Sequence, residues 1–196
     1  MSKKFLAVGF ISLPLLTGCF SVDNSTTSTT PTDTGIQQAK VYNDNQFSFS
    51  YPGNWDLIEQ KDFTSDIPKE TQVVIRNNIK NETFTADVNV VKNDLQIDES
   101  SLDYAKAVLN RQKTGLLDYK ETKRDLVKIN VGGQDQDTYY TEFDARLNAT
   151  DPVTEFIQTY AVKNKQGYII MAAYSQQETS TVIDQLQKVV KSFKVN

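Results

Sequence analysis

The chain has 196 residues, a formal net charge of −4, a single cysteine and no histidine. The missing histidine excludes Ser-His-Asp and Cys-His catalysis and removes the commonest transition-metal ligand. The single cysteine excludes a disulfide within one molecule, and the acidic balance disfavours nucleic acid, which attracts clustered Lys and Arg.

The first 18 residues have the organisation of a secretory signal peptide. Lys3 and Lys4 give a positive start, and an apolar run follows from Phe5 to Leu16. That run has about 12 residues, whereas a membrane-spanning helix needs roughly 20. We therefore interpret residues 1–18 as a leader that is removed, not as a membrane span.

The leader ends in Leu16-Thr17-Gly18-Cys19, which resembles the bacterial lipobox. The resemblance implies cleavage after Gly18, a diacylglycerol thioether on Cys19 and an acyl chain, such as palmitate, on the new amino group. One acyl chain binds a membrane only marginally, and two or more hold firmly. We expect a lipid-anchored protein of the cell envelope with its domain outside the cytoplasm. The alternative is an ordinary secreted protein with an incidental cysteine.

The residue after the cysteine bears on the choice of membrane. Phe20 stands where an aspartate would commonly retain a lipoprotein in the inner membrane. If the cell is Gram-negative, Phe20 therefore favours the outer membrane.

Residues 19–39 are predicted to be the lipidated cysteine and a disordered tether. From Ser21 to Gln38 the composition is almost entirely Ser, Thr, Asp, Asn, Gly, Pro and Gln, which cannot bury apolar surface. Such a segment spans on the order of 24 Å as a coil and about 65 Å when stretched. Residues 40–196 then form one predicted domain, without an internal repeat.

Strand patterns dominate the first half of this domain. Phe47, Phe49 and Tyr51 alternate with serines, which predicts a half-buried strand, and Pro52-Gly53-Asn54 predicts a turn before Trp55 opens the next strand. A short apolar run covers 72–76. The alternation of Phe84, Ala86, Val88 and Val90 predicts a further strand with Asp87 and Asn89 on its polar face.

A helix, four strands and a second helix follow. Ser100 and Asp103 form a capping box for the first helix, which Gly115 is expected to end. Strands are predicted at 127–131, 138–143, 155–162 and 168–174, with turns at Gly132-Gly133 and around 164–167. The last helix is predicted to be capped by Ser175 and Glu178. The order of elements predicts an α+β fold with helices packed against an antiparallel sheet.

Four segments of the domain resemble the PsbP family. They are Phe47-Ser-Phe-Ser-Tyr-Pro-Gly-Asn-Trp55, Gly132-Gly133 before the paired Tyr139 and Tyr140, Gly167-Tyr-Ile-Ile-Met-Ala-Ala-Tyr174, and Val189-Val-Lys-Ser-Phe193. They occur in the family's order and span nearly the whole domain. The resemblance implies a central antiparallel sheet with helices on both faces, a three-layer α/β/α sandwich. It also implies a domain that binds or stabilises protein partners, without catalytic residues to carry over.

Paired carboxylates are the remaining candidates for chemistry. Asp135 and Asp137, and likewise Glu142 and Asp144, lie two residues apart, so each pair shares a face of a strand. Facing carboxylates bind Ca²⁺ or work as an acid/base pair, and they equally occur on a solvated strand face. We expect the solvated face, and therefore no catalytic, cofactor or metal site.

Three functions stay open at this point. The favoured one is a non-enzymatic module that binds a protein partner of unknown identity, attached to a membrane through Cys19. The second is a carbohydrate- or cell-wall-binding module that uses exposed aromatic side chains, and the third is a carboxylate-dependent hydrolase. The sequence predicts no nucleic-acid partner for any of them.

Overall fold

The computed structural model describes residues 38–65, 67–78 and 84–196. The predicted leader, the lipid site at Cys19 and nearly all of the predicted tether lie outside the described residues. The elements are β1 (Lys40–Asn43), β2 (Phe47–Tyr51), β3 (Asp56–Glu59), a short 3-10 turn η1 (Gln60–Asp62), β4 (Thr71–Arg76), β5 (Asp87–Asp94), α1 (Ser101–Gly115), β6 (Leu117–Val131), β7 (Gln134–Arg146), β8 (Thr154–Lys163), β9 (Gln166–Ser175), α2 (Ser180–Lys191) and β10 (Lys194–Val195).

The strands form one ten-stranded sheet in the order β1-β2-β10-β6-β7-β8-β9-β5-β4-β3. Neighbouring strands are antiparallel, as predicted, with one exception. β10 runs parallel to β6 and pairs with it only between Val195 and Val131. The two-residue β10 therefore joins the β1–β2 hairpin to the rest of the sheet.

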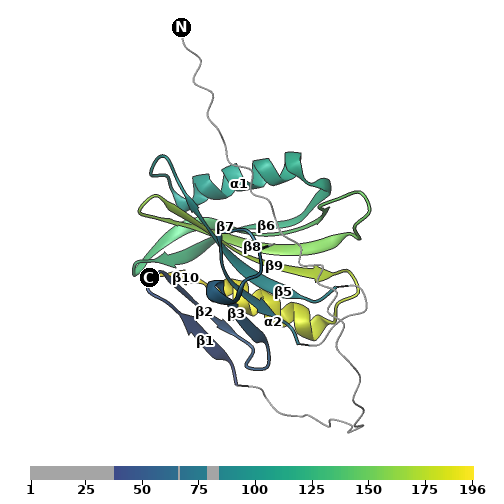
Figure 1. Cartoon of the computed structure of the whole chain (residues 1–196). Coiled ribbons are helices and arrows are strands. Elements are labelled where there is room, and N and C mark those ends of the chain that lie inside the picture. The colour runs from purple at the N-terminus through teal and green to yellow at the C-terminus, as the bar shows by residue number, and fades with distance from the viewer. Residues whose placement is uncertain (1–37, 66, 79–83) are drawn as a thin grey trace.

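Alternate residues of the central strand β8 belong to two different hydrophobic clusters. On β8, Phe156 and Tyr160 belong to the cluster of α1, whereas Ile157 and Ala161 belong to the cluster of α2. Because successive side chains of a strand point to opposite faces, each helix packs against a different side of β8. Figure 1 shows α1 and α2 separated by the central strands.

The sheet is curled and not flat. The cluster around α2 contains both Phe47 and Phe49 of β2 and Val73 and Ile75 of β4, which stand near opposite ends of the strand order. Only a sheet that curves around α2 brings these residues together, and Figure 1 shows that curvature. The predicted α+β class is confirmed. The three-layer sandwich implied by the resemblance is not confirmed, because the sheet curls around α2 instead of forming a flat layer between two helical layers.

The helix starts test the predicted capping boxes. Ser100 caps α1 as predicted, since its hydroxyl accepts a hydrogen bond from the Asp103 N–H at 3.0 Å. The predicted cap of the last helix at Ser175 is wrong. Ser175 is the last residue of β9, where it pairs with Thr154, and Thr179 caps α2 four residues later. Strand pairing therefore overrides a local capping-box sequence at Ser175.

Strand boundaries differ most where pairing is long-range. β6 begins at Leu117, ten residues before the predicted strand, because it pairs with β7 along its whole length. Trp55 precedes β3, and its N–H donates to the Pro52 carbonyl in a turn. Within the described residues, no helix is both long and apolar enough to cross a membrane.

Candidate functional site

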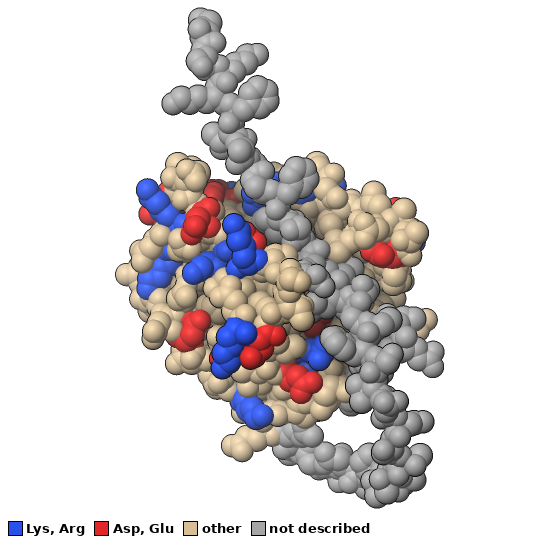
Figure 2. All heavy atoms as spheres, in the orientation of Figure 1, with Lys and Arg blue, Asp and Glu red and all other residues tan. Residues whose placement is uncertain are grey.

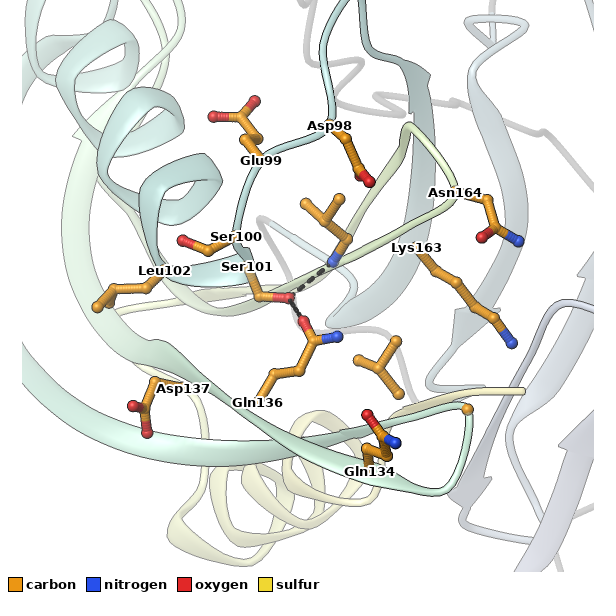
Figure 3. A pocket seen from close by; sticks show the side chains of 13 residues that line it. Asp98, Glu99, Ser100, Ser101, Leu102, Gln134, Gln136, Asp137, Lys163 and Asn164 are labelled. Atoms are coloured by element: carbon orange, nitrogen blue, oxygen red, sulfur yellow. Dashed lines mark hydrogen bonds between the residues drawn. The ribbon is translucent and has the colours of Figure 1, made fainter.

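A pocket of about 820 Å³ opens at one end of the sheet, where α1 begins (Figure 3). Three segments line it: residues 98–102 at the start of α1, the β6–β7 turn with the first residues of β7, and the end of β8. The turn contains Gly132 and Gly133, whose φ angles of 60° and 82° glycine adopts without the strain that a side chain causes. These segments are far apart in the sequence, so only the folded sheet assembles the pocket.

Ser101 connects the three segments that line the pocket. Its side chain is fully buried, and its hydroxyl donates to the Gln136 Oε1 at 2.6 Å and accepts from the Val162 N–H at 2.9 Å (Figure 3). Both bonds fix the start of α1 to β7 and β8. This hydroxyl is therefore committed to structure and is not positioned as a nucleophile.

The charges around the pocket are mixed. Asp98, Glu99 and Asp137 contribute carboxylates, and Lys163 contributes an ammonium group that hydrogen-bonds the Asn196 carbonyl. The carboxylates would repel an anion, and the partial positive charge at the N-terminal end of α1 would repel a cation. The pocket thus suits polar, uncharged groups better than a small ion.

Asp135 and Asp137, the first predicted carboxylate pair, lie at the exposed start of β7. Asp137 forms an ion pair with Lys128 at 2.6 Å, and Asp135 accepts a hydrogen bond from the Asn130 side chain at 3.4 Å. Each carboxylate thus has its own neighbour on β6. This is the solvated strand face that the sequence predicted.

Glu142 and Asp144, the second pair, are partly buried on the side of β7 that faces α2. Glu142 accepts a hydrogen bond from the Tyr140 hydroxyl at 2.9 Å, and Asp144 lies opposite Glu155 in the β7–β8 register. Burial and the hydrogen bond to Glu142 both raise the pKa of Tyr140. Among the described residues, no group of three or more Asp, Glu, Cys or His could hold a metal ion.

The aromatic side chains of the described residues are mostly in the interior. Phe47, Phe49 and Trp55 are at most 3% exposed, and no described Phe, Tyr or Trp falls in the exposed class. A row of exposed rings, which a carbohydrate-binding surface would need, is thus not formed by this part of the chain.

Sequence reasoning missed a carboxylate with a strongly shifted pKa, Asp87. The alternation along β5 placed Asp87 and Asn89 on a polar face, but Asn89 is only 7% exposed and Asp87 is partly buried. Burial raises the pKa of Asp87 to about 7, against the opposing effects of a hydrogen bond with Asn89 and the charge of Arg76. No local signal in the sequence reveals that this second face is covered.

Asp87→Asn is expected to stabilise the domain above neutral pH. A folded-state pKa of about 7 exceeds the unfolded value of about 3.9, so the stability held below pH 4 is lost as the pH rises through 7. We expect a gain of about 1–2 kcal/mol at pH 8, reduced by partial exposure, and little change at pH 4. Urea unfolding at both pH values measures it.

The exposed Asp56 on β3 supplies the control for this prediction. Asp56→Asn changes the net charge equally but should not produce the same gain at pH 8. An equal gain from both variants would show that net charge, and not burial of Asp87, sets the pH dependence.

The face of the molecule that is visible in Figure 2 gives no sign of a nucleic-acid site. Figure 2 shows Lys and Arg interspersed with Asp and Glu over the visible face, without one large patch of a single sign. This distribution agrees with the net charge of −4.

Comparison with known proteins gives one family and several folds. The PsbP family profile matches residues 37–195. The structure is similar to cyanobacterial PsbP (CyanoP) from Synechocystis sp. PCC 6803, with a TM-score of 0.54 at 16% identity over 85% of this chain and 98% of that one. No curated protein matches the sequence.

Two further solved structures share the fold. The Ran-binding protein Mog1p of Saccharomyces cerevisiae has a TM-score of 0.53 at 13% identity, covering 81% of this chain and 96% of its own. LpqN of Mycobacterium tuberculosis, described as involved in cell envelope biogenesis, has a TM-score of 0.52 at 13% identity over 83% and 87%. At these identities the likeness is one of fold.

Proposed function

The chain belongs to the PsbP family, and from this premise we propose that it is a non-enzymatic module that binds a protein partner at the cell envelope. In this proposal, lipid on Cys19 holds the chain to a membrane after cleavage behind Gly18. The observation that carries it is the order of the sequence: a short apolar leader, a lipobox, a polar segment, and then the family domain at 37–195.

The partner-binding part rests on the site and on the proteins of the same fold. Both serines of the pocket beside α1 have structural hydrogen bonds: Ser101 is bound to Gln136 and Val162, and Ser100 caps α1 and donates to the Asp103 carboxylate. Mog1p binds Ran, and LpqN takes part in envelope biogenesis. These roles support a binding function.

Cys19→Ala tests the anchor. We expect the variant to remain an unprocessed precursor and to lose metabolic labelling with a fatty acid completely, because the chain has no other cysteine to accept the lipid. Membrane fractionation after alkaline extraction supplies a second readout. Unchanged labelling of the variant would contradict the lipobox assignment.

The same pair of strains tests partner binding. After crosslinking in intact cells, we expect the lipidated chain to co-purify with a protein that the Cys19→Ala control does not enrich. If both strains give the same proteins, the envelope partner is refuted even where lipid labelling succeeds. A glycan as the only enriched ligand would instead favour the carbohydrate-binding alternative.

A further inference from the structure

The outer edge of β6 is open along most of its length. β7 pairs with one side of β6, whereas β10 reaches the other side only at Val131. Among the described residues, no other strand lies beside Leu117–Asn130 on that side. A strand edge of this kind presents unpaired N–H and C=O groups to the solvent.

Bulges limit the part of this edge that another strand can use. The β6–β7 register shifts between Leu117 and Lys120 and again between Glu121 and Lys123. Asp118, within the first shift, has a φ of 53°. From Lys123 to Asn130 the register is regular, so this eight-residue stretch, which we call the β6 ledge, is the usable part.

The β6 ledge differs from the two end strands of the sheet. β1 and β3 have four residues each, too few for a long ladder. The β6 ledge is twice as long and carries Leu126, whose side chain is 63% exposed. β1 also carries an exposed apolar side chain, Val41, so length is what favours strand addition at β6 over the end strands.

The charge of the β6 ledge selects the partner. Lys123, Arg124 and Lys128 stand against a single acid, Asp125, which gives a net charge of +2 in a chain of net −4. Their ion pairs with Asp125, Glu121 and Asp137 are at the surface, and each contributes about 0–1 kcal/mol, so a partner can replace them. An acidic strand would find cations on both faces of the ladder.

A second copy of this chain fits the β6 ledge poorly. Two antiparallel copies would bring together two strands that each have a net charge of +2. In a dimer with a two-fold axis, the residues that lie opposite one another also point to the same face of the sheet. A register centred on Leu126 sets Arg124 opposite Lys128, and one centred on Asp125 sets two aspartates face to face. A register centred on Val127 avoids these contacts, but it still joins two strands of net +2. Like charges directly opposite one another destabilise a ladder.

We propose that the β6 ledge, Lys123–Asn130, is the site at which an extended, acidic segment of a partner protein adds to the sheet as a further strand. This inference rests on the proposed function and names the surface and the chemistry of its partner. Main-chain hydrogen bonds to β6 hold the segment, and its carboxylates face Lys123, Arg124 and Lys128.

A photo-crosslinking residue at Leu126 of the full chain, expressed in its own cells, tests the site. We expect an adduct whose mapped partner peptide carries a net negative charge. Val41 on β1 is the matched control, because its side chain is 67% exposed and it too lies on an edge strand. An adduct to another copy, to a basic peptide or equally at both positions overturns the proposal.

Charge variants then separate the β6 ledge from general charge. Lys123→Glu with Lys128→Glu is expected to lower the adduct yield about tenfold, which corresponds to the loss of two surface ion pairs. Lys61→Glu with Lys69→Glu makes the same change in net charge at side chains that are 73% and 91% exposed, and should leave the yield unchanged. Equal loss from both pairs overturns the inference.

Amide exchange tests whether the segment adds as a strand. A synthetic peptide of the mapped sequence, added to the purified full chain, should slow exchange of alternate amides across 123–130, since one side of a strand carries every second N–H. Unchanged exchange overturns strand addition. An adduct at Val41 alone refutes the β6 ledge but leaves the proposed function standing, whereas no protein adduct at either position refutes both.

Discussion

Gly167→Ala is expected to destabilise the domain by about 3 kcal/mol, at the upper end of the cost of overpacking a core. A methyl group at Gly167 would lie 2.4 Å from the Tyr104 Cζ and 2.7 Å from its Cε2. Tyr104 cannot move away easily, because it is 1% exposed and its hydroxyl accepts a hydrogen bond from Asn93 at 3.0 Å. Gly167 is equally held, since β9 pairs there with both β5 and β8.

Urea unfolding measures this loss as a lower midpoint at constant slope. Gly115→Ala is the matched control, because no atom lies within 4 Å of the added methyl group and alanine suits the end of α1. Tyr104→Leu removes the ring, so the double variant with Gly167→Ala should be clearly more stable than the sum of the two single effects. A Gly167→Ala variant as stable as Gly115→Ala would contradict the packing argument.

Gly167 also shows what the sequence can and cannot reveal. The sequence predicts a turn around residues 164–167, and the turn is there, but its left-handed residues are Asn164 and Lys165, with φ angles of 51° and 59°. Gly167 is glycine because Tyr104, 63 positions earlier, occupies the space of a side chain. A contact at that separation leaves no local pattern.

Structure that depends on residues close together in the chain can, by contrast, be predicted from the sequence. Ser100 caps α1 through Asp103, three residues away, and Gly132-Gly133 turns the chain between two adjacent strands. The candidate site was not readable, because Ser101 meets Gln136 and Val162 only after the sheet has formed. The sequence identifies the two carboxylate pairs, but the hydrogen bonds and ion pairs of these side chains depend on neighbours across the strands, which only the fold brings together.

The β6 ledge could not be predicted from the sequence for a different reason. Periodicity predicted a strand only at 127–131, since Lys120 to Asp125 is a charged run without alternating apolar residues. Pairing with β7 extends the strand through that run. The most open edge of the sheet is thus the segment that looked least like a strand.

Val195→Asp is the second change with a large expected effect. Val195 is 1% exposed and pairs with Phe47 on one side and Val131 on the other. A carboxylate at this position would lose its water inside the apolar cluster that surrounds Val195. We expect a loss of about 3–5 kcal/mol, comparable to leaving a single buried charge uncompensated.

The position of the loss distinguishes this prediction from general destabilisation. β10 joins β1–β2 to β6, so amide exchange should accelerate in β1 and β2 before it does in β8 and β9. Lys194→Asp is the control, because Lys194 is the exposed neighbour in the same strand and should change stability by less than about 0.5 kcal/mol. If β8 and β9 opened together with β1 and β2, β10 would not be the local link between the hairpin and the sheet.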